Sequence, residues 1–270
     1  MNALRVSIRI LCAALALSCV LATQQLFAGP LTANQIPTIT IAIEDVPEPP
    51  NWSYTPPVDA YRPATDADGG YELASPQDFD ILENRAHVRI EELQFDPDPF
   101  VLNNILVTNT TNSTQIFSAF VGLPTSFGAP NSISGNVRTS VIDGGLDGAT
   151  VATVGGQALY QAQIDFATVA TLQNDPFSVS APGGGSNTAS ESFGPTSNAV
   201  PVNSNIGIQL RFTLTAGDTA AILSRFDVVP EPASLALVGI GLALLTGIAG
   251  RVGRRQVTGS PSRECLEFQN

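Results

Sequence analysis

A strict alternation of apolar and polar residues near the C-terminus constrains the fold more than any other feature of this chain. From Ile206 to Leu214 every second residue is apolar, and the residues between them are Gly, Gln, Arg and Thr. Successive side chains of a β-strand point to opposite faces of the sheet, so this period of two predicts a strand with one buried and one wet face. Other segments alternate or are apolar over a strand's length, and turn-forming residues separate them: 36–44, 86–95, 100–107, 115–123, 137–142, 149–154, 160–166 and 220–228.

No stretch of the body shows helical periodicity of useful length. About eight to ten short strands separated by turns are typical of an antiparallel β-sandwich. We therefore predict an all-β fold, a single antiparallel β-sandwich domain over residues 29–229. Two segments break the pattern: we predict a long proline-rich loop at 46–76 and a mobile Gly-, Ser- and Asn-rich surface loop at 181–205.

One strand and two connections can be predicted in more detail. The phase of the strand 86–95 changes in its middle, and a β-bulge at Glu91 and Glu92 would restore it. Segments 100–107 and 115–123 form either a hairpin or a connection between two sheets. Residues 216–219 are expected to turn the strand 206–214 back into 220–228.

The sequence from Asp143 to Gly148 is rich in Asp and Gly and lies between two predicted strands. Asp-Gly is a strong hairpin signal, so we predict a tight turn here. The carboxylates of Asp143 and Asp147 leave calcium binding through oxygen as the alternative, although their spacing matches no EF-hand loop.

The N-terminus has the layout of a secretory signal peptide. Arg5 and Arg9 precede an apolar run over 10–22, and small residues follow. Cleavage after Ala22 and cleavage after Ala28 both fit, and we assign residues 1–28 to the signal peptide. The body 29–229 contains no cysteine and must rely on its core, because the three cysteines lie elsewhere: Cys12, Cys19 and Cys265.

A second apolar run lies at 233–250 and carries no charge. As a helix it would be about 27 Å long, which just spans the hydrocarbon core of a bilayer. We therefore predict one C-terminal transmembrane helix. Arg251, Arg254 and Arg255 follow it and place that flank, with the tail 256–270, in the cytoplasm.

The sequence V-P-E-P-A-S-L at 229–235, the apolar run and the arginine cluster together resemble the PEP-CTERM sorting signal of Gram-negative bacterial surface proteins. The resemblance covers the segment 230–255 and implies that Pro230, Glu231 and Pro232 are recognised by exosortase, a membrane protease or transpeptidase. It also implies an exported protein, anchored in the membrane through the C-terminal helix before processing and found afterwards at the cell surface or in the extracellular matrix. The alternative is an ordinary C-terminal membrane anchor behind a proline-rich linker.

Composition excludes several classes of function. The chain has 24 acidic and 12 basic residues and a net charge of −12, which repels phosphate backbones and argues against nucleic acid as a partner. His87 is the only histidine and the body has no cysteine, so Cys-His catalysis and a histidine metal cluster are excluded. No G-x-S-x-G elbow is present. We predict a protein that is not an enzyme, with no catalytic residues, no metal and no cofactor.

The predicted function is that of an exported surface or extracellular-matrix protein with a structural or adhesive role in the exopolysaccharide layer. Its expected partners are exosortase and extracellular polysaccharide. The first alternative is a carbohydrate-binding β-sandwich module in which Trp52 and Tyr54 stack on sugar rings, although aromatics in such a loop also pin it to the core. A two-carboxylate glycosidase is the less favoured alternative, because sequence does not show how far apart its acids lie.

Overall fold

The structure is a computed structural model and describes residues 31–44, 52–65, 70–81, 84–96, 100–128 and 131–230. Several sequence predictions fall outside the described residues: the signal peptide 1–28, the helix 233–250, the tail 256–270, and Glu231, Pro232, Arg251, Arg254 and Arg255. Within the part that is described, no helix is long and apolar enough to cross a membrane.

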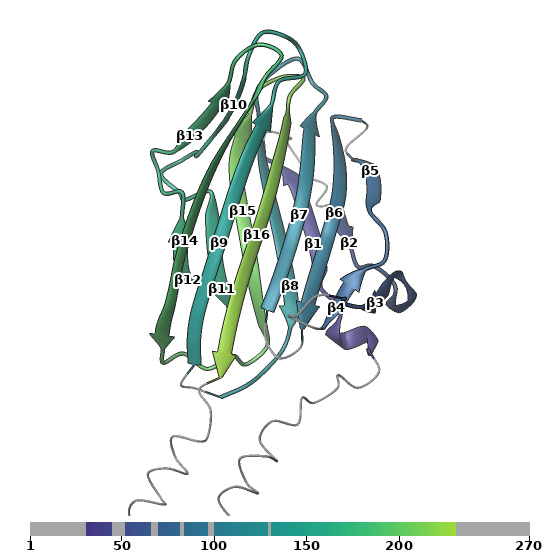
Figure 1. The fold of residues 1–270 in the computed structure, drawn as a ribbon, viewed down its shortest axis with the longest axis vertical. Helices are drawn as coiled ribbons and strands as arrows, with labels where there is room; N and C mark the ends of the chain where they lie inside the picture. The colour runs from purple at the N-terminus through teal and green to yellow at the C-terminus, as the bar shows by residue number, and fades with distance from the viewer. Residues whose placement is uncertain are drawn as a thin grey trace, which may run out of the picture.

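Two antiparallel sheets of eight strands each lie face to face (Figure 1), which confirms the predicted all-β fold. Sheet A contains β1 (Thr38–Ile43), β2 (Trp52–Tyr54), β8 (Gln115–Pro124), β10 (Ala149–Ala152), β11 (Tyr160–Ile164), β12 (Ala167–Leu172), β13 (Ser178–Ala181) and β15 (Asn205–Leu214). Sheet B contains β3 (Tyr61–Pro63), β4 (Tyr71–Leu73), β5 (Gln77–Ile81), β6 (Ala86–Asp96), β7 (Phe100–Asn109), β9 (Asn131–Ile142), β14 (Ser186–Asn198) and β16 (Thr219–Pro230). Two short 3-10 helices complete the described elements, η1 (Ala33–Gln35) and η2 (Val58–Ala60).

The strands that alternate best in the sequence lie at the centres of the two sheets. Sheet A runs in the order β12-β11-β15-β8-β1-β2, with β10 also paired to β15 and β13 paired to β10. Sheet B runs β14-β9-β16-β7-β6-β4-β3, with β5 paired to β6. A central strand is paired on both sides and faces the other sheet, so its buried face must be uniformly apolar.

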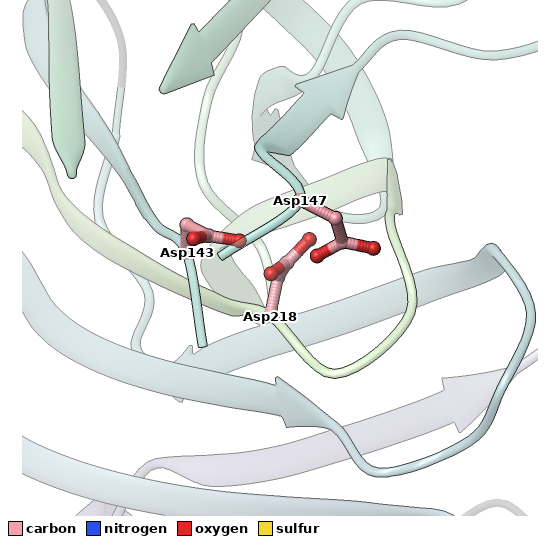
Figure 2. A group of neighbouring side chains, drawn as sticks. All are labelled: Asp143, Asp147 and Asp218. Atoms are coloured by element: carbon pink, nitrogen blue, oxygen red, sulfur yellow. The ribbon is translucent and has the colours of Figure 1, made fainter. Parts of the chain in front are cut away.

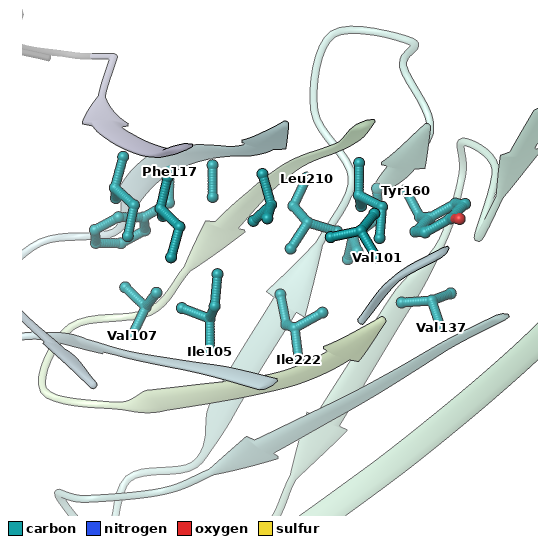
Figure 3. Packing of buried hydrophobic residues seen from close by; sticks show 14 of the residues in the cluster. Val101, Ile105, Val107, Phe117, Val137, Tyr160, Leu210 and Ile222 are labelled. Carbon is teal, nitrogen blue, oxygen red and sulfur yellow. The ribbon is translucent and has the colours of Figure 1, made fainter. Parts of the chain in front are cut away.

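The core fills the space between the sheets. Figure 3 shows Phe117, Leu210 and Tyr160 of sheet A facing Ile105 and Ile222 of sheet B. All five side chains are at most 1% exposed, as expected for the inner faces of a sandwich.

Tyr160 links the two sheets through a polar bond inside this core. Its hydroxyl donates a hydrogen bond of 2.9 Å to the backbone carbonyl of Arg225 on β16. Gly135 on β9 leaves the space for it, because a Cβ at this position would lie 2.8 Å from the hydroxyl oxygen and 2.6 Å from the ring of Phe193. Burial raises the pKa of Tyr160 far above its ordinary value, so the hydroxyl remains a proton donor.

The predicted β-bulge in β6 is confirmed. The pairing of β6 with β7 shifts register between Ile90 and Glu92, which leaves Glu91 as the extra residue. Ile90 and Leu93 consequently both face the core, although they lie an odd number of residues apart.

The turns predicted at Asp143–Gly148 and at 216–219 are present, but neither joins its two flanking strands into a hairpin. β9 and β16 belong to sheet B, whereas β10 and β15 belong to sheet A, so each short connection crosses from one layer to the other. The connection between β7 and β8 crosses in the same way, which was one of its two predicted forms. Turn residues show where a strand ends, but tertiary packing decides which sheet receives the next strand. The register of β16, where Thr219 pairs with Thr108 and Ile142, places the three connections at one end of the sandwich, called here the crossover end.

Both predicted loops contain strands. The described residues of 46–76 include β2, β3, β4 and the helix η2. β2 and β3 are edge strands of three residues, where a proline such as Pro63 is tolerated because one side of the backbone is unpaired. The segment 181–205 contains β14, thirteen residues long, whose polar side chains are nearly all exposed because it is an edge strand held by backbone pairing with β9.

The strand predicted over 160–166 ends early, at Ile164. Asp165 and Phe166 have φ angles of 51° and 65° and lead into β12, a strand that the sequence did not predict. The Asp165 carboxylate accepts backbone N–H bonds from Ser204 at 2.7 Å, from Asn203 at 2.9 Å and from Asn205 at 3.1 Å. Burial acts to raise the pKa of Asp165, but these bonds outweigh it and hold the pKa far below the ordinary value.

Candidate functional sites

The last strand of the sandwich ends where the predicted recognition motif begins. β16 runs to Pro230, which pairs with Asn131 of β9, and on its other side the pairing stops at Asp227. Val228 is buried, whereas Val229 and Pro230 are exposed. The prediction that the last strand leads directly into the sorting signal is confirmed, and Val229 and Pro230 lie within the strand itself.

A group of carboxylates lies at the crossover end, at the opposite end of β16. From Thr219 to Pro230 the strand spans about 37 Å at 3.4 Å per residue. Asp143, Asp147 and Asp218 each offer an oxygen there, and these oxygens lie within 4.8 Å of one another. Figure 2 shows the three side chains close together, Asp143 and Asp147 from the connection between β9 and β10 and Asp218 from the connection between β15 and β16.

Asp143 and Asp218 accept hydrogen bonds from backbone amides of the surrounding connections. Asp143 accepts N–H bonds from Leu146 at 2.8 Å, from Gly148 at 3.1 Å and from Gly184. Asp218 is fully buried and accepts a bond of 3.2 Å from the amide of Gly144. These two carboxylates therefore hold the ends of neighbouring connections together.

The Gly184 amide, assisted by other loop amides and opposed by burial, lowers the pKa of Asp143. Three carboxylate oxygens at this separation are also the hard ligands that Ca²⁺ takes. Sequence reasoning identified Asp143 and Asp147 but missed Asp218. Asp218 lies more than seventy positions further along the chain than Asp143, in a connection assigned to a simple turn.

The aromatic residues predicted for sugar contact lie on the edge strand β2. Trp52 and Tyr54 are stacked with ring centroids 5.7 Å apart, and each ring lies 4.6 Å from that of Phe79 on β5. β2 belongs to sheet A and β5 to sheet B, so the three rings cover one open side of the sandwich. Both Trp52 and Tyr54 remain partly exposed, and their contact with sugar stays a prediction.

His87 lies on the outer face of sheet B between two carboxylates. Its Nδ1 lies 2.9 Å from Asp80 and its Nε2 lies 3.3 Å from Asp78. These bonds, that to Asp80 first and then that to Asp78, raise the pKa of His87 against the opposing effect of burial. Because both ring nitrogens already contact carboxylates, His87 is placed to form ion pairs rather than to activate a hydroxyl nucleophile.

No curated protein sequence matches this chain. Among solved structures, a cyclase from Fischerella sp. TAU has 12% identity and a TM-score of 0.26. The match covers 48% of this chain and 65% of the cyclase. TmCBM61 in complex with β-1,4-galactotriose has 11% identity and a TM-score of 0.23, over 48% of this chain and 82% of that one. The C-terminal CBM6 of LamC from Zobellia galactanivorans has 12% identity and a TM-score of 0.20, over 70% of this chain and 98% of that one. At these TM-scores the similarities say nothing about function.

The family comparison concerns the C-terminal segment. A model described as the PEP-CTERM protein-sorting motif matches residues 228–255. The matched segment begins at Val228, the last buried residue of β16, and extends through the apolar run and the arginine cluster. The chain therefore carries a PEP-CTERM protein-sorting motif that starts inside the final strand of its β-sandwich.

Proposed function

We propose that this protein is exported, sorted by an exosortase-type membrane enzyme, and retained as a structural or adhesive component of the extracellular polysaccharide layer. The observation that carries the proposal is the sorting motif at 228–255, joined directly to a folded β-sandwich. Pro230, Glu231 and Pro232 are the residues that the enzyme recognises. The apolar run 233–250 holds the chain in the membrane until processing, with Arg251, Arg254 and Arg255 on the cytoplasmic side.

The end of β16 determines how the enzyme meets its substrate. Since Pro230 is still paired with Asn131, Glu231 follows the folded body without a spacer. The sandwich consequently lies close to the membrane surface before processing, with its crossover end about 37 Å further out. Processing at or near Pro230 releases the whole two-sheet body.

The proposal assigns no catalytic activity to the body. His87 is engaged by Asp78 and Asp80, and the Asp143 carboxylate accepts backbone amides of the surrounding loops. A two-carboxylate glycosidase is the competing enzymatic hypothesis. Hydrolysis of any member of a broad polysaccharide panel by the purified protein would favour it over the matrix function.

Sorting is tested by intact mass and location of the protein in its own host, with and without Pro230-Glu231-Pro232 replaced by three alanines. We expect the wild type to lose its C-terminal helix and the variant to keep it. The chain offers a matched control, because Pro47-Glu48-Pro49 is the same tripeptide without an apolar run after it. Replacing this second tripeptide should leave processing unchanged. Retention of the sequence through Asn270 in both wild type and variant would show that the C-terminus is only an anchor.

The second candidate function is a carbohydrate-binding module that uses Trp52 and Tyr54. It is supported by the stacked, partly exposed pair of rings at one edge of the sandwich. If binding to a glycan disappears in Trp52→Ala, this function is favoured. If the protein is extracted with the matrix polysaccharide irrespective of this substitution, the first proposal is favoured.

A further inference from the structure

The outer face of sheet A, which points away from the core, carries an unusual arrangement at its centre. Strand register places Thr40 opposite Phe120, Phe120 opposite Gln209, and Gln209 opposite Gln161. All four side chains are half-buried, as expected for residues on the wet face of a sheet. They form one row across four adjacent strands, β1, β8, β15 and β11.

The neighbouring row contains two glycines at its centre. Thr38 pairs with Gly122, Gly122 with Gly207, and Gly207 with Gln163. The row thus has side chains at both ends and none in the middle, over a width of about 14 Å between its outer strands.

The ring of Phe120 occupies this gap. A Cβ at Gly122 would lie 2.6 Å from ring atom Cε1 of Phe120, and one at Gly207 would lie 2.6 Å from Cε2. Both ring edges can approach the backbone so closely only because both positions are glycine. The ring therefore lies across the two glycines, and it borders Thr38 on one side and Gln163 on the other.

A second aromatic ring extends this surface. Phe166 is 68% exposed, and its ring centroid lies 5.8 Å from that of Phe120 at an interplanar angle of 35°. Its position is fixed by the preceding residue, because Asp165 is bound by the amides of Asn203, Ser204 and Asn205. An exposed ring on a well-anchored turn loses little conformational freedom on binding a ligand.

Polar groups without charge surround the two rings. The side chains of Thr40 and Gln163 have no hydrogen-bond partner among the described residues, and the side-chain amide oxygen of Gln161 accepts a bond from the Thr168 hydroxyl. Near the turn, a shallow polar depression of about 340 Å³ is lined by residues that include Asn203, Ser204 and Pro124. It adjoins the same surface, since Asn203 and Ser204 also bind Asp165.

The charged side chains near these rings are bound by other groups of the protein. In the next row of the sheet, Arg211 is opposite Ser118, and its guanidinium forms bonds of 2.7 and 2.5 Å to the two carboxylate oxygens of Glu44. Asp165 stays ionised, but backbone amides of residues 203–205 bind its carboxylate. The rows around the two rings thus carry no unpaired cation, on a protein of net charge −12, which disfavours acidic polymers as ligands.

We propose that the outer face of sheet A binds a neutral polysaccharide, with the rings of Phe120 and Phe166 stacking on sugar faces and Gln163 hydrogen-bonding sugar hydroxyls. The proposal rests on the matrix function above and names its ligand class and binding surface. Sugar rings present apolar faces edged by neutral hydroxyls, and this surface presents aromatic faces edged by amides and hydroxyls. It lies on β8, β11 and β15, separate from the Trp52–Tyr54 pair on the edge strand β2.

The test is affinity electrophoresis of the protein purified from its host, in gels containing the neutral fraction of that host's exopolysaccharide. Alginate serves as the acidic control polymer. We expect the neutral fraction to retard the wild type and alginate to have no effect. Phe166→Ala should weaken binding roughly tenfold, as expected for the loss of a stacking ring, and Gln163→Ala should weaken it a few-fold. The control, Leu146→Ala, removes an apolar side chain that is 80% exposed at the crossover end and should bind as the wild type does.

Both test residues lie on the surface, so their variants should fold, and unchanged circular dichroism would establish this. Absence of retardation of the wild type, or unchanged binding by both Phe166→Ala and Gln163→Ala, would overturn the proposal. Loss of binding in Trp52→Ala alone would assign the ligand to the edge strand and would also overturn it. The triple-alanine sorting variant separates this test from that of the proposed function, because it should bind the polysaccharide in gels even when its processing fails.

Discussion

Tyr160→Phe removes one hydroxyl from the centre of the sandwich and leaves the ring in place. That hydroxyl donates a bond of 2.9 Å to the Arg225 carbonyl, and Tyr160 is completely buried. A buried hydrogen bond of this kind contributes about 1 to 1.5 kcal/mol, and no large cavity term is added because the ring still packs. For a domain of this size the loss corresponds to a decrease in Tm of roughly 2 to 6 °C.

Gly135→Ala provides the companion perturbation. Its Cβ would lie 2.6 Å from Phe193 Cε1, 2.8 Å from Tyr160 Oη and 2.9 Å from the Arg225 carbonyl oxygen. Because the last contact is with backbone, the strands must shift, and we expect a cost of about 1 to 3 kcal/mol. Removing the Tyr160 hydroxyl relieves one of the three contacts, so Gly135→Ala should cost about 0.5 to 1 kcal/mol less in the Tyr160→Phe background.

The assay is urea unfolding of the four proteins of this cycle, followed by the emission of Trp52, the single tryptophan, and by circular dichroism. An unfolding free energy for Tyr160→Phe within about 0.3 kcal/mol of wild type would contradict the assigned hydrogen bond. If the costs of the two substitutions are strictly additive, the glycine at position 135 is not what makes room for the Tyr160 hydroxyl.

Three further predictions concern the surface. Because hydrogen bonds to Asp80 and Asp78 raise the pKa of His87, its ion pairs stabilise the fold fully below about pH 6.5 and are lost as pH rises through the raised value. With His87 41% and Asp80 64% exposed, unfolding free energy should fall by less than about 1 kcal/mol over that range, and His87→Gln should remove the change. Asp143→Ala should make the crossover connections more sensitive to protease, and in the wild type the same sensitivity should appear as pH falls below about 4, because the pKa of Asp143 is lowered. Phe79→Ala should shift Trp52 emission to the red and destabilise the protein by about 1 kcal/mol or more, whereas unchanged emission would contradict the ring contact.

The sorting signal and the strands of the core could be predicted from the sequence because both depend on local order. The motif is a contiguous run of residues, and Ile206 to Leu214 alternate with a period that permits only a strand. The bulge at Glu91 was equally predictable, since Ile90 and Leu93 need the same face and only an extra residue allows it. These signals concern neighbours along the chain.

Only the tertiary structure decided which strands share a sheet and which side chains meet. The connections after β9 and β15 have turn residues typical of hairpins, yet they cross between layers, because packing rather than turn chemistry selects the sheet. β14 has no apolar periodicity of its own and forms because its backbone pairs with that of β9. The surface formed by Phe120, Gly122, Gly207 and Phe166 could not be predicted, since strand register alone brings together residues more than eighty positions apart.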